Sequence, residues 1–210
     1  MIALTRRTLL LSAAAAAIAS TLPAQAQTDD GALGQPLRAL YAALEATMRA
    51  GRSTPFSQRF DALAPAVDQA FDLETVLKVS VGLRWDTMDA DVKARLFKAY
   101  RRFTVATYVA NFDKNDGEHF QILPGVRESG TDRIVATEII NGGQPTRLDY
   151  VMRDGSGNWK AVDVLLDGSI SRVAVQRSDF RKILESGDTD ALISSLQRKI
   201  ADLSDGALSS

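Results

Sequence analysis

Cysteine is missing from this 210-residue chain, and several patterns that would suggest a function are scarce or absent. Without cysteine there is no disulfide, no thiolate metal site and no cysteine nucleophile. Lysine and arginine number 25 against 26 aspartate and glutamate residues, so no basic excess favours nucleic acid as a partner. With 45% hydrophobic and 24% charged residues, the composition is typical of an ordinary globular domain.

Motifs for catalysis and cofactor binding are also absent. His119 is the only histidine, so a Ser-His-Asp triad would depend on it. Its position beside Asp116 and Glu118 predicts a solvated surface side chain instead. The stretch "DKNDGEH" lacks the spacing and the terminal glutamate of a calcium loop, and there is no phosphate-binding glycine loop and no HExxH pair. We therefore expect neither a metal nor a cofactor.

Residues 1–26 have the pattern of a secretory signal peptide. The stretch "MIALTRRTLLLSAAAAAIASTLPAQAQ" begins with Arg6 and Arg7, continues with an apolar run and ends in small residues at Ala24 and Ala26,. The run is shorter than the roughly 20 residues of a membrane span. We expect cleavage before Gln27 and export to the periplasm as a soluble protein, by the general secretory route or, given "TRRTLLL", by the twin-arginine route. Loss of Arg6 and Arg7 takes the formal net charge from −1 to −3.

The rest of the chain divides into a helical part, a strand part and two closing helices. Residues 27–32 predict a mobile polar leader, and residues 33–205 predict one domain. Helical spacing predicts helices over 33–50, 56–71, 73–81, 88–112, 170–184 and 188–203,. Pro65 should kink or split the second helix. We expect Asp72, Thr87 and Ser169 to cap the third, fourth and fifth helices.

The helix over 88–112 has an unusually wide apolar arc. Two apolar stripes run along it, one with Phe97, Tyr100, Thr104, Tyr108 and Phe112 and one with Val92, Leu96, Ala99, Phe103, Ala106 and Ala110. Together they cover about half the circumference, more than the roughly 100° of a surface helix. The charged residues fall in the remaining sector, so the helix is predicted to meet water on one side only.

From residue 118 the hydrophobic period changes to two. Strands are predicted over 118–123, 132–141, 146–153 and 158–166, separated by turn-rich segments such as "NGGQP" and "DGSGN",. The expected fold is therefore α+β, with a four-stranded antiparallel sheet joined to a helical lobe.

The last of these strands, "WKAVDVLL", has no clear polar face. Strict alternation places Lys160, Val162, Val164 and Leu166 on one side and Trp159, Ala161, Asp163 and Leu165 on the other. A half-buried antiparallel strand should have one polar side. Asp163 is interpreted either as a structural carboxylate, which pairs with Arg147, Arg172 or Arg177 or caps a nearby turn, or as a catalytic base of the kind ketosteroid isomerases use.

Several segments together resemble one known family. In chain order they are "FSQRFDALAPAVDQAFD", "SVGLRWDTM", "FKAYRRFTVATYVANF", "WKAVDVLLDGSIS", "QRSDF" and "DTDALISSLQRKI". This pattern resembles the MlaC or toluene-tolerance family of periplasmic lipid-binding proteins, in which a hopanoid-associated branch is one subfamily. The resemblance covers most of residues 33–203.

The resemblance implies a nuclear-transport-factor-like sheet, a helical lobe and an apolar cavity between them that holds lipid acyl chains. It implies no enzymatic activity and a likeness to the soluble component of an ABC-type transport system. The lipid would be a phospholipid or a hopanoid-type lipid, and the partners an inner-membrane ABC-type complex and an outer-membrane lipoprotein/porin complex. We expect a monomer with these residues near the lipid: Trp85, Phe97, Tyr100, Tyr108, Val135, Ile139, Tyr150, Val162 and Val164. The alternative is a small isomerase or dehydratase with Asp163 as base.

Overall fold

The computed structural model describes residues 30–208, so the predicted signal peptide and the expected start at Gln27 lie outside the described residues. In chain order the elements are α1 (Asp30–Ala50), α2 (Phe56–Ala70), α3 (Leu73–Val81), the 3₁₀ helix η1 (Gly82–Thr87), α4 (Ala90–Asn111), β1 (His119–Ser129), β2 (Asp132–Ile140), β3 (Thr146–Asp154), β4 (Trp159–Leu166), β5 (Ile170–Ser171), α5 (Arg172–Ser186) and α6 (Thr189–Leu203). The α+β class is confirmed. Because α1 begins at Asp30, residues 30–32 of the expected leader are helical.

The strands form one antiparallel meander in the order β1-β2-β3-β4-β5. The sheet therefore has five strands rather than four, since the two-residue β5 returns along β4. Strand β1 is also longer than predicted. Pro124 and Gly125 look like a strand end in the sequence, but a register shift between Ile122 and Val126 accommodates them and pairing continues,.

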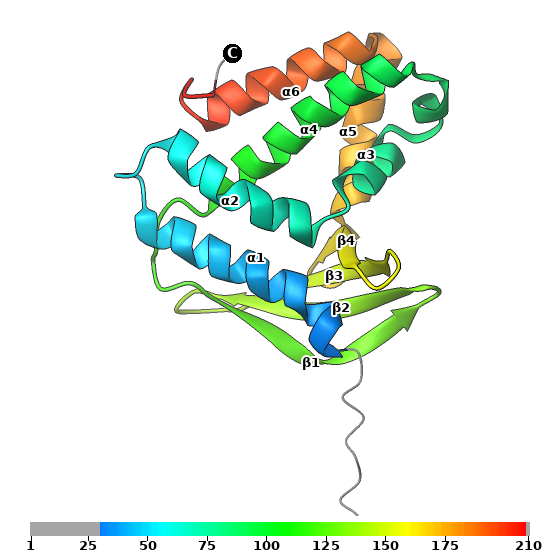
Figure 1. Ribbon diagram of the computed structural model, residues 1–210. Helices are drawn as coiled ribbons and strands as arrows, with labels where there is room; N and C mark the ends of the chain where they lie inside the picture. The colour runs from blue at the N-terminus through cyan, green and yellow to red at the C-terminus, as the bar shows by residue number, and fades with distance from the viewer. Residues whose placement is uncertain (1–29, 209–210) are drawn as a thin grey trace, which may run out of the picture.

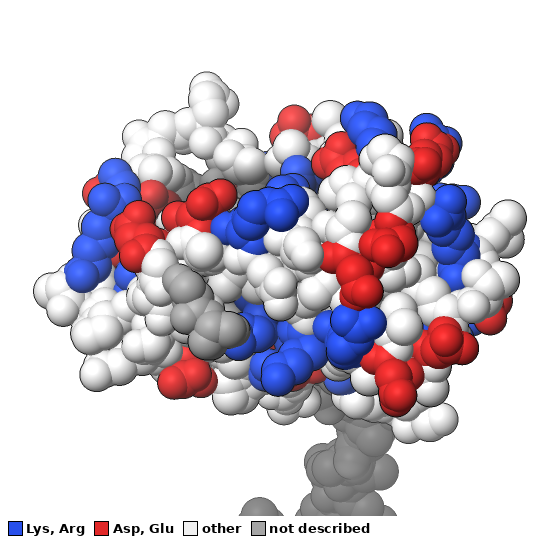
Figure 2. Space-filling model, turned by 90° about the horizontal axis from the view of Figure 1, so that it is seen from above, with Lys and Arg blue, Asp and Glu red and all other residues white. Residues whose placement is uncertain are grey.

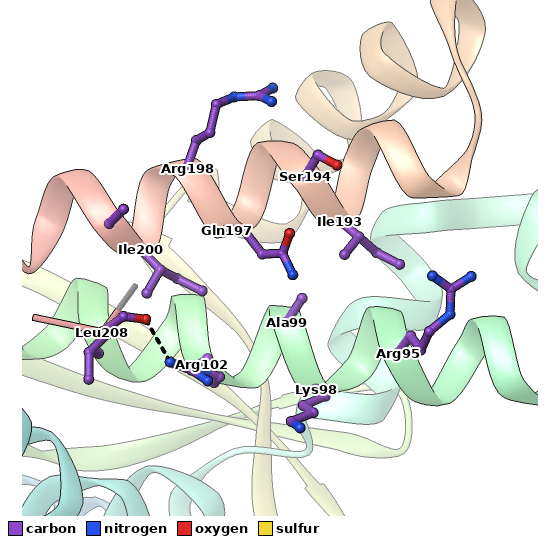
Figure 3. Close-up of a pocket in the computed structure, with 11 residues that line it drawn as sticks. Arg95, Lys98, Ala99, Arg102, Ile193, Ser194, Gln197, Arg198, Ile200 and Leu208 are labelled. Atoms are coloured by element: carbon purple, nitrogen blue, oxygen red, sulfur yellow. Dashed lines mark hydrogen bonds between the residues drawn. The ribbon is translucent and has the colours of Figure 1, made fainter. Parts of the chain in front are cut away.

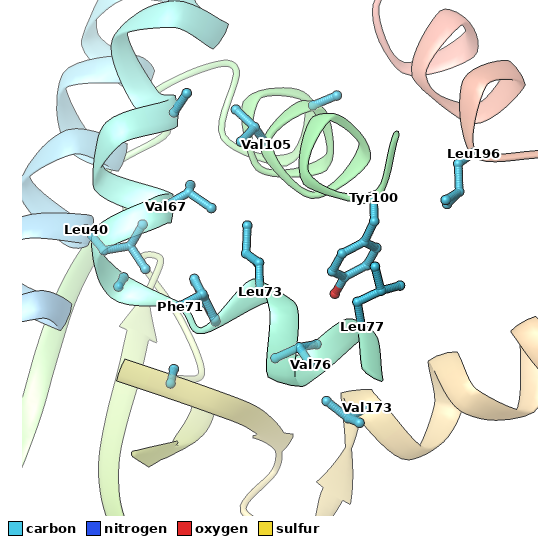
Figure 4. Close-up of a cluster of buried hydrophobic side chains, with 14 of the residues drawn as sticks. Leu40, Val67, Phe71, Leu73, Val76, Leu77, Tyr100, Val105, Val173 and Leu196 are labelled. Atoms are coloured by element: carbon cyan, nitrogen blue, oxygen red, sulfur yellow. The ribbon is translucent and has the colours of Figure 1, made fainter. Parts of the chain in front are cut away.

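The sheet forms the base of the molecule, α1 lies across it, and α2 to α6 are arranged above (Figure 1). Helices α4 and α6 run alongside each other at the side remote from the sheet, and α5 connects the sheet to α6 (Figure 1). The helices meet in a shared core, where Val67 of α2, Leu77 of α3 and Val105 of α4 point toward its interior (Figure 4). No helix of residues 30–208 is both long and apolar enough to span a membrane.

Two helix predictions are corrected by the structure. Helix α2 is not split at Pro65 but runs unbroken from Phe56 to Ala70. Pro65 is on the exposed face, where water can satisfy the carbonyl that the missing N–H leaves free. Thr87 does not cap α4, because it belongs to η1 and donates its hydroxyl hydrogen bond to the carbonyl of Arg84. The N-cap position is Asp89, whose side chain makes no capping bond.

The start of α5 also differs from the prediction. The backbone of Asp167 and Gly168 has positive φ angles of 51° and 71°, and this turn sends the chain back to pair with β4. The helix therefore begins later, and its N-cap is Ser171 rather than Ser169. The predicted cap of α3 is confirmed, since Asp72 accepts a hydrogen bond from the backbone N–H of Thr75 at 3.0 Å.

Charge is spread over the surface. On the helical side opposite the sheet, lysine and arginine side chains alternate with aspartate and glutamate, and neither sign covers the face (Figure 2). His119 is exposed at the start of β1, as predicted.

Candidate functional site

A cavity of about 440 Å³ lies between helix α4 and the sheet. Its walls come from α1, the segment around Phe71, α3, α4, the strands β1 to β4 and the first turns of α5. A volume of roughly 300–1,000 Å³ is typical of ligand pockets. Because so many elements contribute, the cavity is a property of the whole fold.

Six aromatic side chains in the lining of this cavity are linked by a closed cycle of contacts, and we call them the aromatic collar. Successive ring centroids around it are separated by 4.5, 5.6, 6.2, 5.8, 6.1 and 6.2 Å. In order, its members are Tyr41, Phe120, Phe112, Tyr108, Phe71 and Tyr150, which returns to Tyr41. All six line the cavity. These spacings lie in the range of favourable aromatic contacts, so the collar is a mutually packed wall.

All four tyrosines of the protein line the cavity. Burial raises the pKa of each: Tyr41, Tyr100, Tyr108 and, well above its ordinary value, Tyr150. The hydroxyl of Tyr41 donates to Oγ1 of Thr137 at 2.7 Å, which in turn donates to a backbone carbonyl of β3. The tyrosines therefore present neutral hydroxyl groups within an apolar wall.

A β-bulge explains why β4 is apolar on both sides. Tyr150 pairs with Val164 and Met152 pairs with Ala161, with a register shift between Val151 and Met152. Val162 has no partner in this register, so Val164 and Ala161 lie on the same face of the sheet although three positions separate them,. Strict alternation, which placed Val162 and Val164 together, was wrong at this point.

Asp163 anchors the start of α5. Its carboxylate accepts hydrogen bonds from the hydroxyl of Ser171 and from the backbone N–H groups of Val164 and Val173, the latter two at 2.7 and 3.1 Å. Among residues 30–208 it makes no ion pair with arginine, so that expected pairing is corrected. The other interpretation, a cap on a nearby turn, matches the geometry. Arg147 pairs with the buried Asp149 instead.

The neighbours of helix α4 explain why its apolar arc is so wide. Tyr100, Thr104 and Tyr108 face the cavity. Val105 and Val109, in the sector that was predicted to meet water, have no exposed surface. The carbonyl of Val109 accepts a hydrogen bond from Arg59 of α2, which shows that α2 covers this sector. The cavity accounts for only part of the arc, and packing against neighbouring helices accounts for the rest.

A second depression, of about 640 Å³, lies between α4 and α6. Its lining includes Arg95, Lys98, Arg102 and Arg198, and Arg102 donates a hydrogen bond to the carbonyl of Leu208 at one end (Figure 3). Only these two helices and the C-terminal turn contribute to it. It has no counterpart of the aromatic collar, and the collar cavity is therefore the better candidate site.

The structure brings five of the nine predicted residues to the cavity and places four elsewhere. Tyr100, Tyr108, Ile139, Tyr150 and Val164 are in its lining. Trp85, Val135 and Val162 are buried without lining it, and Phe97 lines a different pocket beside Arg101 and Lys160.

Sequence reasoning missed four of the six collar residues and most of the polar rim. Tyr41, Phe71, Phe112 and Phe120 were not predicted as site residues. Arg172 and Gln176, which line the cavity from α5, were not predicted either. A usable signal was composition, because every tyrosine of the chain turned out to line the cavity. Within residues 30–208 no group of three His, Cys, Asp or Glu side chains is placed to hold a metal ion.

These features define a class of protein: an α+β domain whose helices and open sheet enclose an apolar, aromatic-lined cavity. The model of the MlaC protein family matches residues 39–198, well over half of the 210 residues. The chain therefore belongs to the MlaC family.

Comparison with other proteins supports the fold. Among solved structures, a phospholipid-binding protein from Ralstonia solanacearum, in complex with a phospholipid, superimposes with a TM-score of 0.70. The alignment has 17% sequence identity and covers 83% of this chain and 97% of that chain. At this identity the likeness establishes a shared fold. No curated protein matches the chain.

Proposed function

We propose that this protein is a lipid carrier that holds acyl chains inside the collar cavity. The observation that carries the proposal is the cavity itself, which is lined by the aromatic collar and by residues from both the helices and the sheet. Its supports are membership of the MlaC family and the fold shared with a protein solved in complex with a phospholipid. Tyr100, Tyr108, Ile139, Tyr150 and Val164 would contact the lipid.

The free energy of exposing lipid to water explains why a carrier is needed. Each methylene group in water costs about 0.8 kcal/mol, so two acyl chains of ordinary length cost on the order of 20 kcal/mol. A cavity that covers the tails removes most of that barrier without any chemical step. Phenylalanine and tyrosine rings suit such a wall, because they offer a large apolar surface and tyrosine adds a polar tip.

We place the carrier in the periplasm, as the soluble component of an ABC-type lipid transport system. It would move phospholipid, or a hopanoid-type lipid, between an inner-membrane ABC-type complex and an outer-membrane lipoprotein/porin complex. Such a carrier works as a monomer with transient docking, since it must leave each partner as readily as it binds. N-terminal sequencing of exported protein should find Gln27 first, and retention of the apolar run at residues 9–18 would contradict this placement.

Organic extraction of the purified protein tests the carrier function directly. Protein that has been expressed and purified without detergent should release lipid, which mass spectrometry identifies and quantifies against protein. A yield near one lipid per protein is expected. Extraction of only trace lipid from folded protein, and failure of the protein to take up lipid from vesicles, would refute the proposal.

A further inference from the structure

The collar cavity has two charged residues in its lining, Asp163 and Arg172. The carboxylate of Asp163 already accepts hydrogen bonds from Ser171, Val164 and Val173. The side chain of Arg172 differs, because within residues 30–208 it makes neither an ion pair nor a hydrogen bond. One cationic group in the lining of a largely apolar cavity is therefore available to a ligand.

The position of Arg172 has no evident structural purpose. It is the first residue of α5, where the helix dipole makes a positive charge unfavourable. It is exposed, so it contributes little to the packed core. The positive charge of Arg172 lowers the pKa of the Tyr108 hydroxyl, against the larger rise from burial. The guanidinium thus lies close enough to the collar to interact electrostatically with the hydroxyl of Tyr108.

Two backbone N–H groups in the first turn of α5 are not available to an anion. The N–H of Val173 donates to Asp163, and the N–H of Ala174 donates to Oγ of Ser171 at 2.9 Å. These first-turn groups are therefore already satisfied. Gln176, one turn further along the cavity side, donates from its amide to Oγ of Ser80 at 2.7 Å. Among residues 30–208, the Arg172 guanidinium is the cationic donor in the cavity lining, and no protein group accepts from it.

We propose that Arg172 binds the phosphate of a lipid head group at the cavity mouth, and that this residue is what favours a lipid with a phosphate over an uncharged lipid. The inference rests on the proposed carrier function and adds to it a residue that determines specificity. A guanidinium presents a planar set of N–H donors that matches two phosphate oxygens at once. The acyl chains would enter the collar cavity, while the phosphate stays at the mouth, where Arg172 is in contact with water. A neutral lipid would gain nothing from this residue.

A competition experiment tests the inference. The mature protein, after removal of co-purified lipid, is offered phosphatidylglycerol, diacylglycerol with the same acyl chains and the matching free fatty acid in equal amounts. Mass spectrometry then measures the lipids that remain bound after the protein is re-isolated. The wild type should hold phosphatidylglycerol over diacylglycerol by about tenfold, the scale of one charge-assisted hydrogen-bonded contact. The Arg172→Gln variant should lose this preference but still hold diacylglycerol, and Arg172→Lys should keep part of it.

The matched control is Arg181→Gln, which removes the same charge from the same helix. Arg181 does not line the cavity and forms only an exposed 3.6 Å ion pair with Glu185, so this variant should behave as the wild type. Equal retention of phosphatidylglycerol and diacylglycerol by the wild type, or an unchanged preference in Arg172→Gln, overturns the inference and leaves the carrier function standing. A preference for the fatty acid that depends on Arg172 overturns the assignment to phosphate. Retention of no lipid at all by the folded wild type counts against the carrier function itself.

Discussion

Two sides of helix α4 are both apolar, yet they have different partners. On the side covered by α2, Val105 and Val109 have no exposed surface and belong to a packed core. On the side facing the sheet, Tyr100, Thr104 and Tyr108 line the cavity. Hydrophobic periodicity shows that both sides avoid water, but residue type distinguishes them. Short aliphatic side chains fill the packed side, and side chains with a polar tip line the cavity.

The cost of burying an unpartnered hydroxyl group explains why the two sides of α4 differ in residue type. A packed interior leaves no place for an unpartnered hydroxyl group, because burying one without a hydrogen bond costs free energy. A cavity wall tolerates hydroxyl groups that satisfy one another or a backbone carbonyl, as Tyr41 and Thr137 do. A concentration of tyrosine on one face of a helix is therefore informative when no enzyme motif accompanies it.

The largest expected effect comes from a charge on the packed side. In Val105→Asp a carboxylate replaces a side chain with no exposed surface and has no route to water. The loss should be several kcal/mol, comparable with the whole stability of a domain. Thermal unfolding followed by circular dichroism should show no cooperative transition. A folded Val105→Asp protein would show that this side of α4 is not a packed core.

A charge on the cavity side should have a different outcome. In Val164→Glu the carboxylate enters a cavity that opens to solvent, so most of the structure should survive, with a retained melting transition. Co-purifying lipid should fall several-fold, because the charge occupies space that acyl chains need and must be desolvated when they enter. Val105→Asp is the reference for a buried charge in the same protein. Loss of the fold in Val164→Glu would mean that this position is ordinary core.

Much of the fold could be predicted from the sequence, because each helix has its own period and its own end signals. The helices over 73–81 and 188–203 agree closely with α3 and α6, and their capping aspartates are recognisable from local sequence alone. The α+β order follows from the change of period near residue 118.

The site was harder to predict, because its geometry depends on partners that are distant in the sequence. The collar joins Tyr41, Phe71 and Phe120 through contacts across three parts of the chain, which no local pattern specifies. The bulge at Val162 depends on the register with β3, and it reverses the side to which residues on β4 point. For this reason Val162 does not share a face with Val164 and is not in the lining of the cavity.

A third variant tests the anchor between β4 and α5 at the cavity rim. Asp163→Ala removes the acceptor for Ser171 and for two backbone N–H groups, so we expect a loss of about 1–3 kcal/mol in the free energy of unfolding. Urea unfolding measures this, and Asp179→Ala, at an exposed position on α5, should change stability by much less. The isomerase interpretation makes the contrary prediction: Asp163→Asn would abolish turnover of a steroid-like substrate while stability stays the same.

The smallest effect concerns the ionisation of the cavity tyrosines. Burial, followed by the neighbouring tyrosines, raises the pKa of Tyr108 above its ordinary 10.0. A pKa that is higher in the folded state means that the unfolded chain releases its proton first as the pH rises. The stabilisation is therefore complete below about pH 10 and decreases above it, by up to about 1.4 kcal/mol per pH unit for each such group. Urea unfolding at about pH 8 and about pH 11 should show this fall in the wild type. In Tyr108→Phe the free energy of unfolding should fall less between the two pH values than in the wild type. At about pH 8 the variant should be less stable than the wild type by about 1 kcal/mol or less, because it loses only the interaction of the Tyr108 hydroxyl with Tyr150,. The same slope in both proteins would mean that the Tyr108 hydroxyl reaches water in the folded state, and that the collar is open at this point.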